Sequence, residues 1–338
     1  MSATPSSGQV PAALEEVDLR VDLAGIGLKN PVMTASGCAA AGRELDSFFD
    51  VTEIGAVVTK SILLDPRSGR PTPRMAETPS GMLNSIGLQG PGIDSFLATD
   101  LPWLVRRKAR AVVSIAGSSL GEYAELARRV GNSPGVSAVE VNISCPNVHN
   151  RGLVFGCDPY QAAKVMAVVR RDVPRDIPVF AKLSADVTDL VTIAESVMEA
   201  GATGLAMINT LLGLSIDPVS LRPVLGGVTG GLSGPAIRPV ALRCVWQVHQ
   251  AMPDVPIIGI GGISTGLDAL EFLLAGATAV QVGTIIFHDP SAPIRIVAEL
   301  RAEIAARGFT APSQLVGLAH TPTTDARAAT DLEAKRSP

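Results

Sequence analysis

Eight short apolar segments, each followed by a stretch of helix length, constrain the fold of this 338-residue chain more than any other feature. The segments read as nearly continuous apolar runs and not as a polar/apolar alternation, which is typical of strands that are covered on both faces. Strict alternation of strand and helix predicts a parallel sheet, and eight repeats favour closure into a barrel over an open, doubly wound sheet. We therefore predict an α/β fold, a (β/α)8 TIM barrel. The predicted strands are 31–35, 56–59, 111–115, 137–143, 178–183, 203–208, 255–260 and 277–282, and the predicted helices are 44–51, 92–107, 121–130, 159–171, 190–200, 235–251, 266–275 and 292–306.

The barrel pattern occupies residues 17–309 as a single domain, and two Gly/Pro-rich excursions, 61–91 and 211–233, are inserted at the carboxyl ends of strands. Residues 1–16 form a predicted flexible segment that lacks the basic-then-apolar order of a signal peptide. Residues 310–338 are polar and rich in Ala, Thr and Pro, which predicts a mobile tail. No stretch is long and apolar enough to span a bilayer, so we expect no membrane segment.

The composition narrows the class of protein. Apolar residues make up 46% of the chain and charged residues 18%, so the core can be large. The net charge of −4, without a dense Lys/Arg block, disfavours a nucleic-acid partner. The four cysteines are far apart and show no CxxC or metal-type pairing, so we expect neither a metal site nor a disulfide framework. A reducing cytoplasm is the expected location.

Polar residues gather where the predicted strands end. A barrel places its chemistry at the carboxyl ends of the strands and in the loops that follow them. Any single Ser, Asn or Gly there is more often a helix cap or a turn. Two lysines differ, because an unpaired ammonium at the end of an apolar strand is costly, and a bound anion or electron-rich ring would stabilise it. The strand-end residues are Ser36, Lys60, Ser61, Ser114, Asn142, Lys182, Asn209, Thr210, Gly261, Gly262, Gly283 and Thr284.

The glycines after the last two strands favour a phosphate site. Barrels commonly bind phosphate there through backbone N–H groups and the N-terminus of a short helix. Gly261, Gly262 and Gly283 allow close approach of the backbone, because a side chain would block it. Gly234, ahead of the helix predicted at 235–251, is a further candidate contact.

Cys145 lies among polar residues just after the fourth predicted strand, between Asn142 and Asn147. A thiol at the mouth of a barrel could act as a nucleophile or as a general base. A Cys–His nucleophile pair is disfavoured, because His149 lies beyond Pro146 and Asn147 in a loop. Cys244 fits a small apolar core residue, and we assign no role to the remaining two cysteines.

The run Asn142–Asn147 is similar to the signature of the class 1 dihydroorotate dehydrogenases. Further motifs of that family match in the family's order, and the resemblance spans about residues 17–309. These motifs are Val58–Ser61, Asn84–Gly92, Ala181–Ser184, Ile208–Thr210, Gly231–Ile237 and Gly259–Ile263.

The resemblance implies an FMN-dependent oxidation of dihydroorotate to orotate in de novo pyrimidine (UMP) biosynthesis. In that family a cysteine, here Cys145, removes a proton from C5 of dihydroorotate while a hydride passes from C6 to FMN. The implied substrate contacts are Lys60, Asn84, Ser85, Ile86, Gly87, Leu88, Asn142, Asn147, Asn209 and Thr210. The implied flavin contacts are Ser36, Lys60, Ser61, Ser114, Asn142, Lys182 and Ile208, with Gly234, Gly261, Gly262, Gly283 and Thr284 at the phosphate. The excursion 61–91 is long enough to carry Asn84 over the site as a lid.

The family's subdivisions imply different electron acceptors. The quinone-linked class has a serine base and an N-terminal membrane helix pair, which this chain does not match. Within class 1, one group reduces fumarate, and the NAD-linked type (1B) passes electrons to a second subunit that carries FAD and a 2Fe-2S cluster. The Gly231–Ile237 motif resembles the NAD-linked type, which implies a homodimer core with that second subunit. This chain has no iron–sulfur cysteine cluster, so that cluster and the FAD would belong to the partner. The loop 38–44 lacks the bulky aromatic residues that the family pattern implies, and residues 149–151 differ from the Lys/Gly-rich run expected there. These departures bear on how a partner would dock, and they do not involve Cys145.

Three alternatives stay open at this point. A dihydropyrimidine dehydrogenase-like FMN reductase shares the barrel and the cysteine, but we would expect His in place of Asn147. A non-catalytic flavin-binding barrel would have lost Cys145, Lys60 or the asparagines, and the sequence retains them. A barrel that binds a sugar phosphate without flavin would give a colourless protein.

Overall fold

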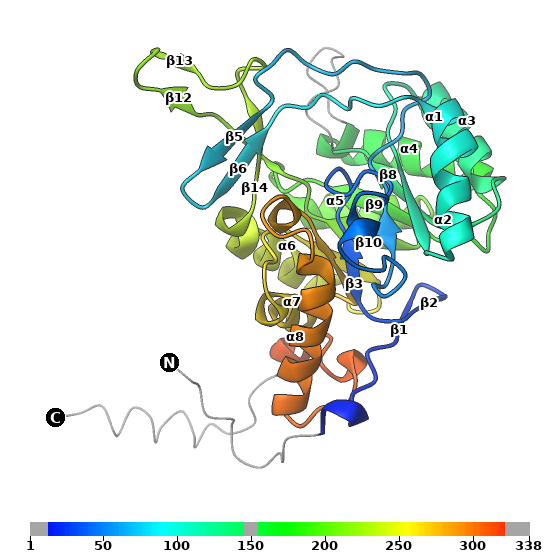
Figure 1. The fold of residues 1–338 in the computed structure, drawn as a ribbon. Coiled ribbons are helices and arrows are strands. Elements are labelled where there is room, and N and C mark those ends of the chain that lie inside the picture. The colour runs from blue at the N-terminus through cyan, green and yellow to red at the C-terminus, as the bar shows by residue number, and fades with distance from the viewer. Residues whose placement is uncertain (1–12, 145–154, 322–338) are drawn as a thin grey trace.

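The computed structural model describes residues 13–144 and 155–321, and within these ranges eight parallel strands form a barrel (Figure 1). The sheet order β3-β16-β15-β10-β9-β8-β7-β4 makes neighbours of strands that follow one another along the chain. Closure is completed by a bridge between Met33 and Ala56, where Gly55 N donates to Val32 O at 2.7 Å. This confirms the predicted (β/α)8 barrel. The strands are β3 (Val32–Thr34), β4 (Val57–Val58), β7 (Ala111–Ile115), β8 (Val136–Asn142), β9 (Val179–Leu183), β10 (Gly204–Met207), β15 (Ile257–Ile260) and β16 (Ala279–Val282).

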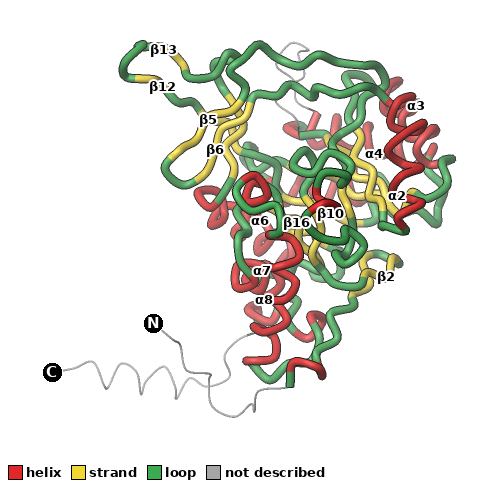
Figure 2. Tube along the Cα trace, in the orientation of Figure 1, coloured by secondary structure: helices red, strands yellow, loops and turns green. Residues whose placement is uncertain are grey.

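Helices surround the strands (Figure 2). A large cluster of buried apolar side chains packs between the two layers. Several helices begin at the side-chain caps that their sequences indicate. Ser119, Asp158, Asp189 and Thr265 each accept a hydrogen bond from a backbone N–H in the first turn. The helices are α1 (Ile93–Ser95), a π-helical turn (Phe96–Asp100), α2 (Leu101–Arg107), α3 (Leu120–Gly131), α4 (Pro159–Asp172), α5 (Leu190–Glu199), α6 (Arg238–Ala251), α7 (Gly266–Leu274) and α8 (Ala292–Ala306).

The helix predicted at 44–51 is wrong, because the structure has only a short 3-10 turn at Leu45–Ser47. The carboxylate of Asp46 accepts hydrogen bonds from Val51 N at 3.4 Å and from the Arg107 guanidinium at 2.7 Å. A short acidic side chain that bonds nearby backbone N–H groups competes with helix propagation.

The barrel interior changes from apolar to polar along the strands. The residues toward the start of the strands are apolar, and they form one buried cluster with a hairpin of β1 (Val21–Leu23) and β2 (Ile26–Leu28). This hairpin was not predicted from the sequence. Residues two positions further along a strand point the same way, and several of these are polar, although they are buried. The apolar positions include Val112, Ala138, Phe180 and Ala279, and the polar positions that follow them are Ser114, Glu140, Lys182 and Gln281.

The two predicted excursions pair with each other instead of forming separate loops. Among the described residues they build a sheet of four antiparallel strands in the order β11-β14-β6-β5. Asn84 is level with Gly231 across the central pair, and a Cβ at Gly231 would lie 2.1 Å from Thr210 Oγ1, so glycine is required there. The strands are β5 (Met75–Thr78), β6 (Gly81–Asn84), β11 (Leu211–Gly213) and β14 (Gly230–Ser233), with a small hairpin of β12 (Ile216–Asp217) and β13 (Arg222–Pro223) beyond them.

The tail predicted to begin at residue 310 differs from the structure, because residues 310–321 pack on the barrel. Leu315 is only 1% exposed, and Gly317 N donates to Leu273 O at 2.9 Å. The His320 ring stacks on Trp246 with 3.6 Å between ring centroids. Residues 1–12 and 322–338, which make up most of the predicted flexible ends, lie outside the described residues. Throughout the described part of the chain, no helix combines the length and apolar character needed to cross a membrane.

Candidate active site

A cavity of about 360 Å³ opens at the carboxyl ends of the barrel strands, where the four-stranded sheet also contributes to its wall. Most of the predicted site residues line it together. Ser85 and Ser114 are fully buried behind the wall instead, and Cys145 and Asn147 lie outside the described residues. The predicted residues that line the cavity are Ser36, Lys60, Ser61, Asn84, Ile86, Gly87, Leu88, Asn142, Lys182, Ile208, Asn209, Thr210, Gly234, Gly261, Gly262, Gly283 and Thr284.

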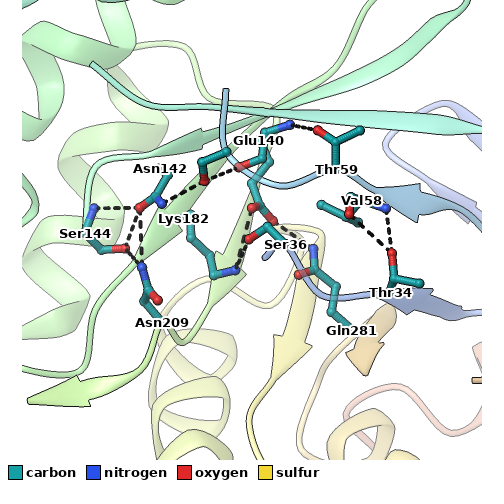
Figure 3. Close-up of polar contacts among 12 residues, drawn as sticks. Thr34, Ser36, Val58, Thr59, Glu140, Asn142, Ser144, Lys182, Asn209 and Gln281 are labelled. Carbon is teal, nitrogen blue, oxygen red and sulfur yellow. Dashed lines mark hydrogen bonds and ion pairs between the residues drawn. The ribbon is translucent and has the colours of Figure 1, made fainter. Parts of the chain in front are cut away.

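Asn142, the last residue of β8, is the centre of a buried hydrogen-bond network (Figure 3). Its Nδ2 donates to Ser61 Oγ at 3.0 Å, and its Oδ1 accepts from Asn209 Nδ2 at 3.3 Å. Asn209 Nδ2 also donates to Ser144 Oγ at 2.8 Å, so residues from three strand ends hold one another. The amides are therefore fixed before any ligand binds, and their remaining polar atoms can face the cavity.

Ser114 supports this network from behind. Its hydroxyl lies 3.0 Å from Ser61 Oγ, and its backbone N–H donates to Thr59 Oγ1 at 3.1 Å. Because Ser114 is fully buried, its structural contribution is to position Ser61.

The segment from Asn84 to Leu88 lies over the cavity as the continuation of β6. Asn84 Nδ2 donates to Gly231 O at 3.3 Å, which ties the segment to β14. Ser85 N donates to Arg74 O at 2.7 Å, and Arg70 Nη1 donates to Ser85 Oγ at 3.3 Å. These bonds explain why Ser85 faces the protein and not the cavity.

Charged and polar groups form the floor of the cavity. Lys182, on β9, is 3% exposed, and its Nζ lies 3.6 Å from Glu140 Oε1, an ion-pair distance that is too long for a good hydrogen bond. Lys182 Nζ also makes a long contact of 3.5 Å to Ser36 Oγ. Gln281 Nε2 donates to Glu140 Oε2 at 2.8 Å (Figure 3). Within the described part of the chain, Gln281 Oε1 is buried without a hydrogen-bond partner.

The glycine residues form a narrow cradle at another part of the cavity. Gly262 has a φ of +69°, and a Cβ there would lie 2.6 Å from Gly234 O. Short 3-10 helices follow Gly234, at Pro235–Ile237, and Gly283, at Thr284–Phe287. Glycine backbones at the start of such turns can approach an anionic group closely.

Several residues that line or support the cavity were not predicted from the sequence. Glu140 and Gln281 could have been found from the sequence, because each is a polar residue inside an otherwise apolar strand. Cys38, to which we assigned no role, lines the cavity. Burial raises the pKa of its thiol to about 11, although the Lys182 and Lys60 ammonium groups act in the opposite direction. The cavity lining also includes the apolar residues Met75, Met82, Ile285 and Phe287, and no feature of the sequence indicated their place there.

Metal chemistry has no candidate site in the described ranges, where no three His, Cys, Asp or Glu side chains group as metal ligands. The site therefore offers fixed amides, two lysines and a backbone cradle. Such a set can bind a ligand with a polar ring and an anionic group, and can stabilise negative charge that develops on the ring.

Comparisons with known proteins show which family this chain is similar to. Residues 18–304 match the family model described as dihydroorotate dehydrogenase. The chain is 53% identical over 300 residues to a protein of Geotalea daltonii named dihydroorotate dehydrogenase B (NAD(+)), catalytic subunit, with 89% of this chain and 97% of that protein covered. A protein of Anoxybacillus flavithermus with the same name is 48% identical over 299 residues, covering 88% and 95%.

A solved structure is similar over nearly the whole chain. The crystal structure of DHODH from Eimeria tenella in complex with ferulenol superposes with a TM-score of 0.77 at 26% sequence identity. The similarity covers 93% of this chain and 92% of that one.

Proposed function

The chain belongs to the dihydroorotate dehydrogenase family, and we propose that it oxidises dihydroorotate to orotate in pyrimidine biosynthesis with FMN as its cofactor and Cys145 as the base. The observation that carries the proposal is one cavity lined by Lys60, Asn84, Asn142 and Asn209 above the buried Lys182. These residue types fit a pyrimidine ring that carries a carboxylate.

The residues present fit FMN. The cavity has a glycine cradle suited to a phosphate, and Gln281 Oε1 is a buried acceptor without a partner in the described ranges, suited to a ring N–H. The Lys182 ammonium at the floor would stabilise negative charge on an electron-rich ring. When bound, FMN would accept the hydride that leaves C6 of dihydroorotate. Gly234, Gly262, Gly283 and Thr284 would hold its phosphate, and Ser36, Lys60 and Ser61 would lie along its ring system.

The asparagines would bind and orient the substrate. Asn142 and Asn209 are held rigidly by each other and by Ser144, so their orientation does not need to change when a ring binds. Asn84, at the end of β6, and Thr210, just before β11, would contact the ring or its carboxylate. The Lys60 ammonium would attract that carboxylate.

Cys145 would remove the proton from C5. The residue lies outside the described residues, so its role rests on the sequence motif. Ser144, the last described residue before it, is 2% exposed and is hydrogen-bonded to Asn142 and Asn209, which both line the cavity. A free thiol has a pKa of about 8.5, so a useful fraction of thiolate forms near neutral pH.

A second subunit would take the electrons onward. Two of the relatives are named catalytic subunits of an NAD(+)-linked enzyme, which supports a separate partner subunit. By the resemblance of the sequence motifs, that partner would carry FAD and a 2Fe-2S cluster beside a homodimer core. Met75 and Phe287 line the cavity and are 45% and 53% exposed, so they are apolar side chains that the surface of a partner could cover. Cys38, Cys157 and Cys244 are free thiols, which fits a reducing cytoplasm.

The test is an anaerobic half-reaction. The chain is purified, its visible spectrum is recorded, and dihydroorotate is added without oxygen. We expect flavin absorbance that bleaches in the wild type and in Cys157→Ala, a control at an exposed cysteine, but not in Cys145→Ala at the same pH. Flavin that bleaches with dihydrouracil but not with dihydroorotate would overturn the substrate. Failure to bind added FMN would overturn the cofactor.

The acceptor is tested with the same protein. NAD-dependent turnover that appears only when a candidate FAD and iron–sulfur subunit is added would support the NAD-linked type. Turnover of the purified chain alone with fumarate would contradict it.

A further inference from the structure

Glu140 is a buried carboxylate that the proposed catalysis does not use. Its side chain is 0% exposed and lies beneath the cavity instead of lining it. Its Oε1 lies 3.6 Å from Lys182 Nζ, and its Oε2 accepts a hydrogen bond from Gln281 Nε2 at 2.8 Å. Both partners line the cavity, so Glu140 contacts two groups of the floor at once (Figure 3).

The register of the barrel places the carboxylate behind the ammonium. On the paired strands β8 and β9, Asn142 is level with Lys182, and Glu140 is level with Phe180. Glu140 is therefore two residues deeper in the barrel than Lys182, next to the apolar interior. The carboxylate approaches the ammonium from the side away from the cavity opening.

A buried charge of either sign is costly unless it is paired and hydrogen-bonded. Lys182 has its ion pair with Glu140 and the long contact with Ser36, and Glu140 has its bond from Gln281. We propose that Glu140 is a positioning residue, which holds the Lys182 ammonium at the cavity floor and compensates its charge, and so sets the reduction potential of the bound flavin. The inference rests on the FMN site proposed above.

Glu140→Gln isolates the charge from the shape. The amide has nearly the same size and keeps an oxygen that can accept from Gln281 Nε2. The pair of Lys182 and residue 140 changes from neutral to a net charge of +1. A positive charge near a flavin ring favours its electron-rich, reduced form, so we expect a higher midpoint potential. A tenfold stronger preference for the reduced form corresponds to about 30 mV for a two-electron couple.

A double-mutant cycle shows whether Glu140 acts through Lys182. In Lys182→Met there is no ammonium for Glu140 to hold at the cavity floor. Adding Glu140→Gln to that background should therefore cause little further change in potential. Thr34→Val is the matched control, because it removes a buried hydroxyl that bonds the Val58 backbone in another barrel strand.

The measurements are spectroelectrochemical potentials of the five FMN-loaded proteins, with the FMN dissociation constant from fluorescence quenching and stability from urea unfolding. The proposal expects a raised potential in Glu140→Gln, little further effect of that change in Lys182→Met, and a wild-type potential in Thr34→Val. A purely structural Glu140 would lower stability with an unchanged potential, which overturns the inference. A lowered potential, or an equal shift in both backgrounds, also overturns it. Wild-type protein that binds no FMN would instead remove the proposed function on which the inference rests.

Discussion

Asp268 links the glycine cradle to the helix behind it, and its removal tests how that cradle is held. Its Oδ2 accepts from Ser264 N at 2.8 Å and from Thr265 N at 3.0 Å, and its other oxygen pairs with Arg238. Ser264 lines the cavity two residues after Gly262. Asp268 is 6% exposed, so these bonds are largely shielded from water.

The expected loss of stability in Asp268→Ala follows from those contacts. A hydrogen bond to a charged group contributes about 1.5–3 kcal/mol, and the two backbone bonds share one carboxylate oxygen. The Arg238 side chain is 33% exposed, so its ion pair adds little after solvent screening. We expect the free energy of unfolding to fall by about 3 kcal/mol, near the lower limit for two charge-assisted bonds. Asp268→Asn, which keeps one oxygen acceptor, should lose about half as much.

The assay is urea unfolding with and without FMN. A ligand that binds only the native state stabilises it by an amount that grows with the ratio of its concentration to its dissociation constant. Because Asp268→Ala should loosen the cradle and weaken FMN binding, the stabilisation gained from a fixed FMN concentration should be smaller in this variant than in the wild type. Glu271→Gln is the control, because Glu271 lies on the same helix and pairs with Arg238 at 3.6 Å, but is 42% exposed. If Asp268→Ala and Glu271→Gln are equally stable, the reasoning about the cradle is refuted.

Three further predictions follow from single residues. Gly262→Ala should weaken FMN binding by at least tenfold, because φ is +69° and the new Cβ would lie 2.6 Å from Gly234 O. In the control Gly283→Ala the nearest atom to the new Cβ is 3.1 Å away, so this variant should lose less FMN affinity. Equal FMN dissociation constants for the two variants would contradict this. Burial, followed by a neighbouring histidine, lowers the pKa of His249 from 6.5, so the stability it contributes is present above that pH and is lost as the pH falls below it. Urea midpoints over about pH 5–8 should show this loss relative to His249→Asn, and parallel curves would refute it. Burial raises the pKa of Cys38 to about 11, so iodoacetamide should label this thiol very slowly at neutral pH in cofactor-free protein, and rapid labelling in a peptide map would show the assignment to be wrong.

The barrel could be predicted because its signal is local and repeated. The strands from Ala111–Ile115 onward are largely apolar runs, and each is followed by a segment of helix length, several of which begin at a side-chain cap. The topology of such a chain then places every strand end at one mouth. Lys60, Asn142 and Lys182 could therefore be brought together from sequence position alone, before any side-chain contact was known.

The parts that could not be predicted depend on contacts between distant residues. Asn84 bonds the strand that contains Gly231 across 147 positions, and both strands are too short to show a clear two-residue apolar alternation. Similarly, His320 belongs to a polar, Ala-rich stretch, and its order depends on the Trp246 ring. The local composition of such a segment predicts mobility, and the contact that orders it is with a residue far away in the sequence.

The buried Lys182–Glu140 pair also shows why a polar barrel layer indicates function more than stability. Removing one partner of a buried ion pair typically costs 3–5 kcal/mol, whereas replacing the whole pair with apolar groups of similar volume is neutral or stabilising by about 1–4 kcal/mol. Gln281 must be replaced as well, because its Nε2 would otherwise lose its acceptor. We expect Lys182→Met/Glu140→Leu/Gln281→Leu to unfold at the wild-type urea midpoint or above it, while Lys182→Met alone unfolds earlier. The triple variant should bind FMN much more weakly. If it were instead less stable than Lys182→Met, the polar layer would be a structural requirement of the barrel, and its position under the cavity would need another explanation.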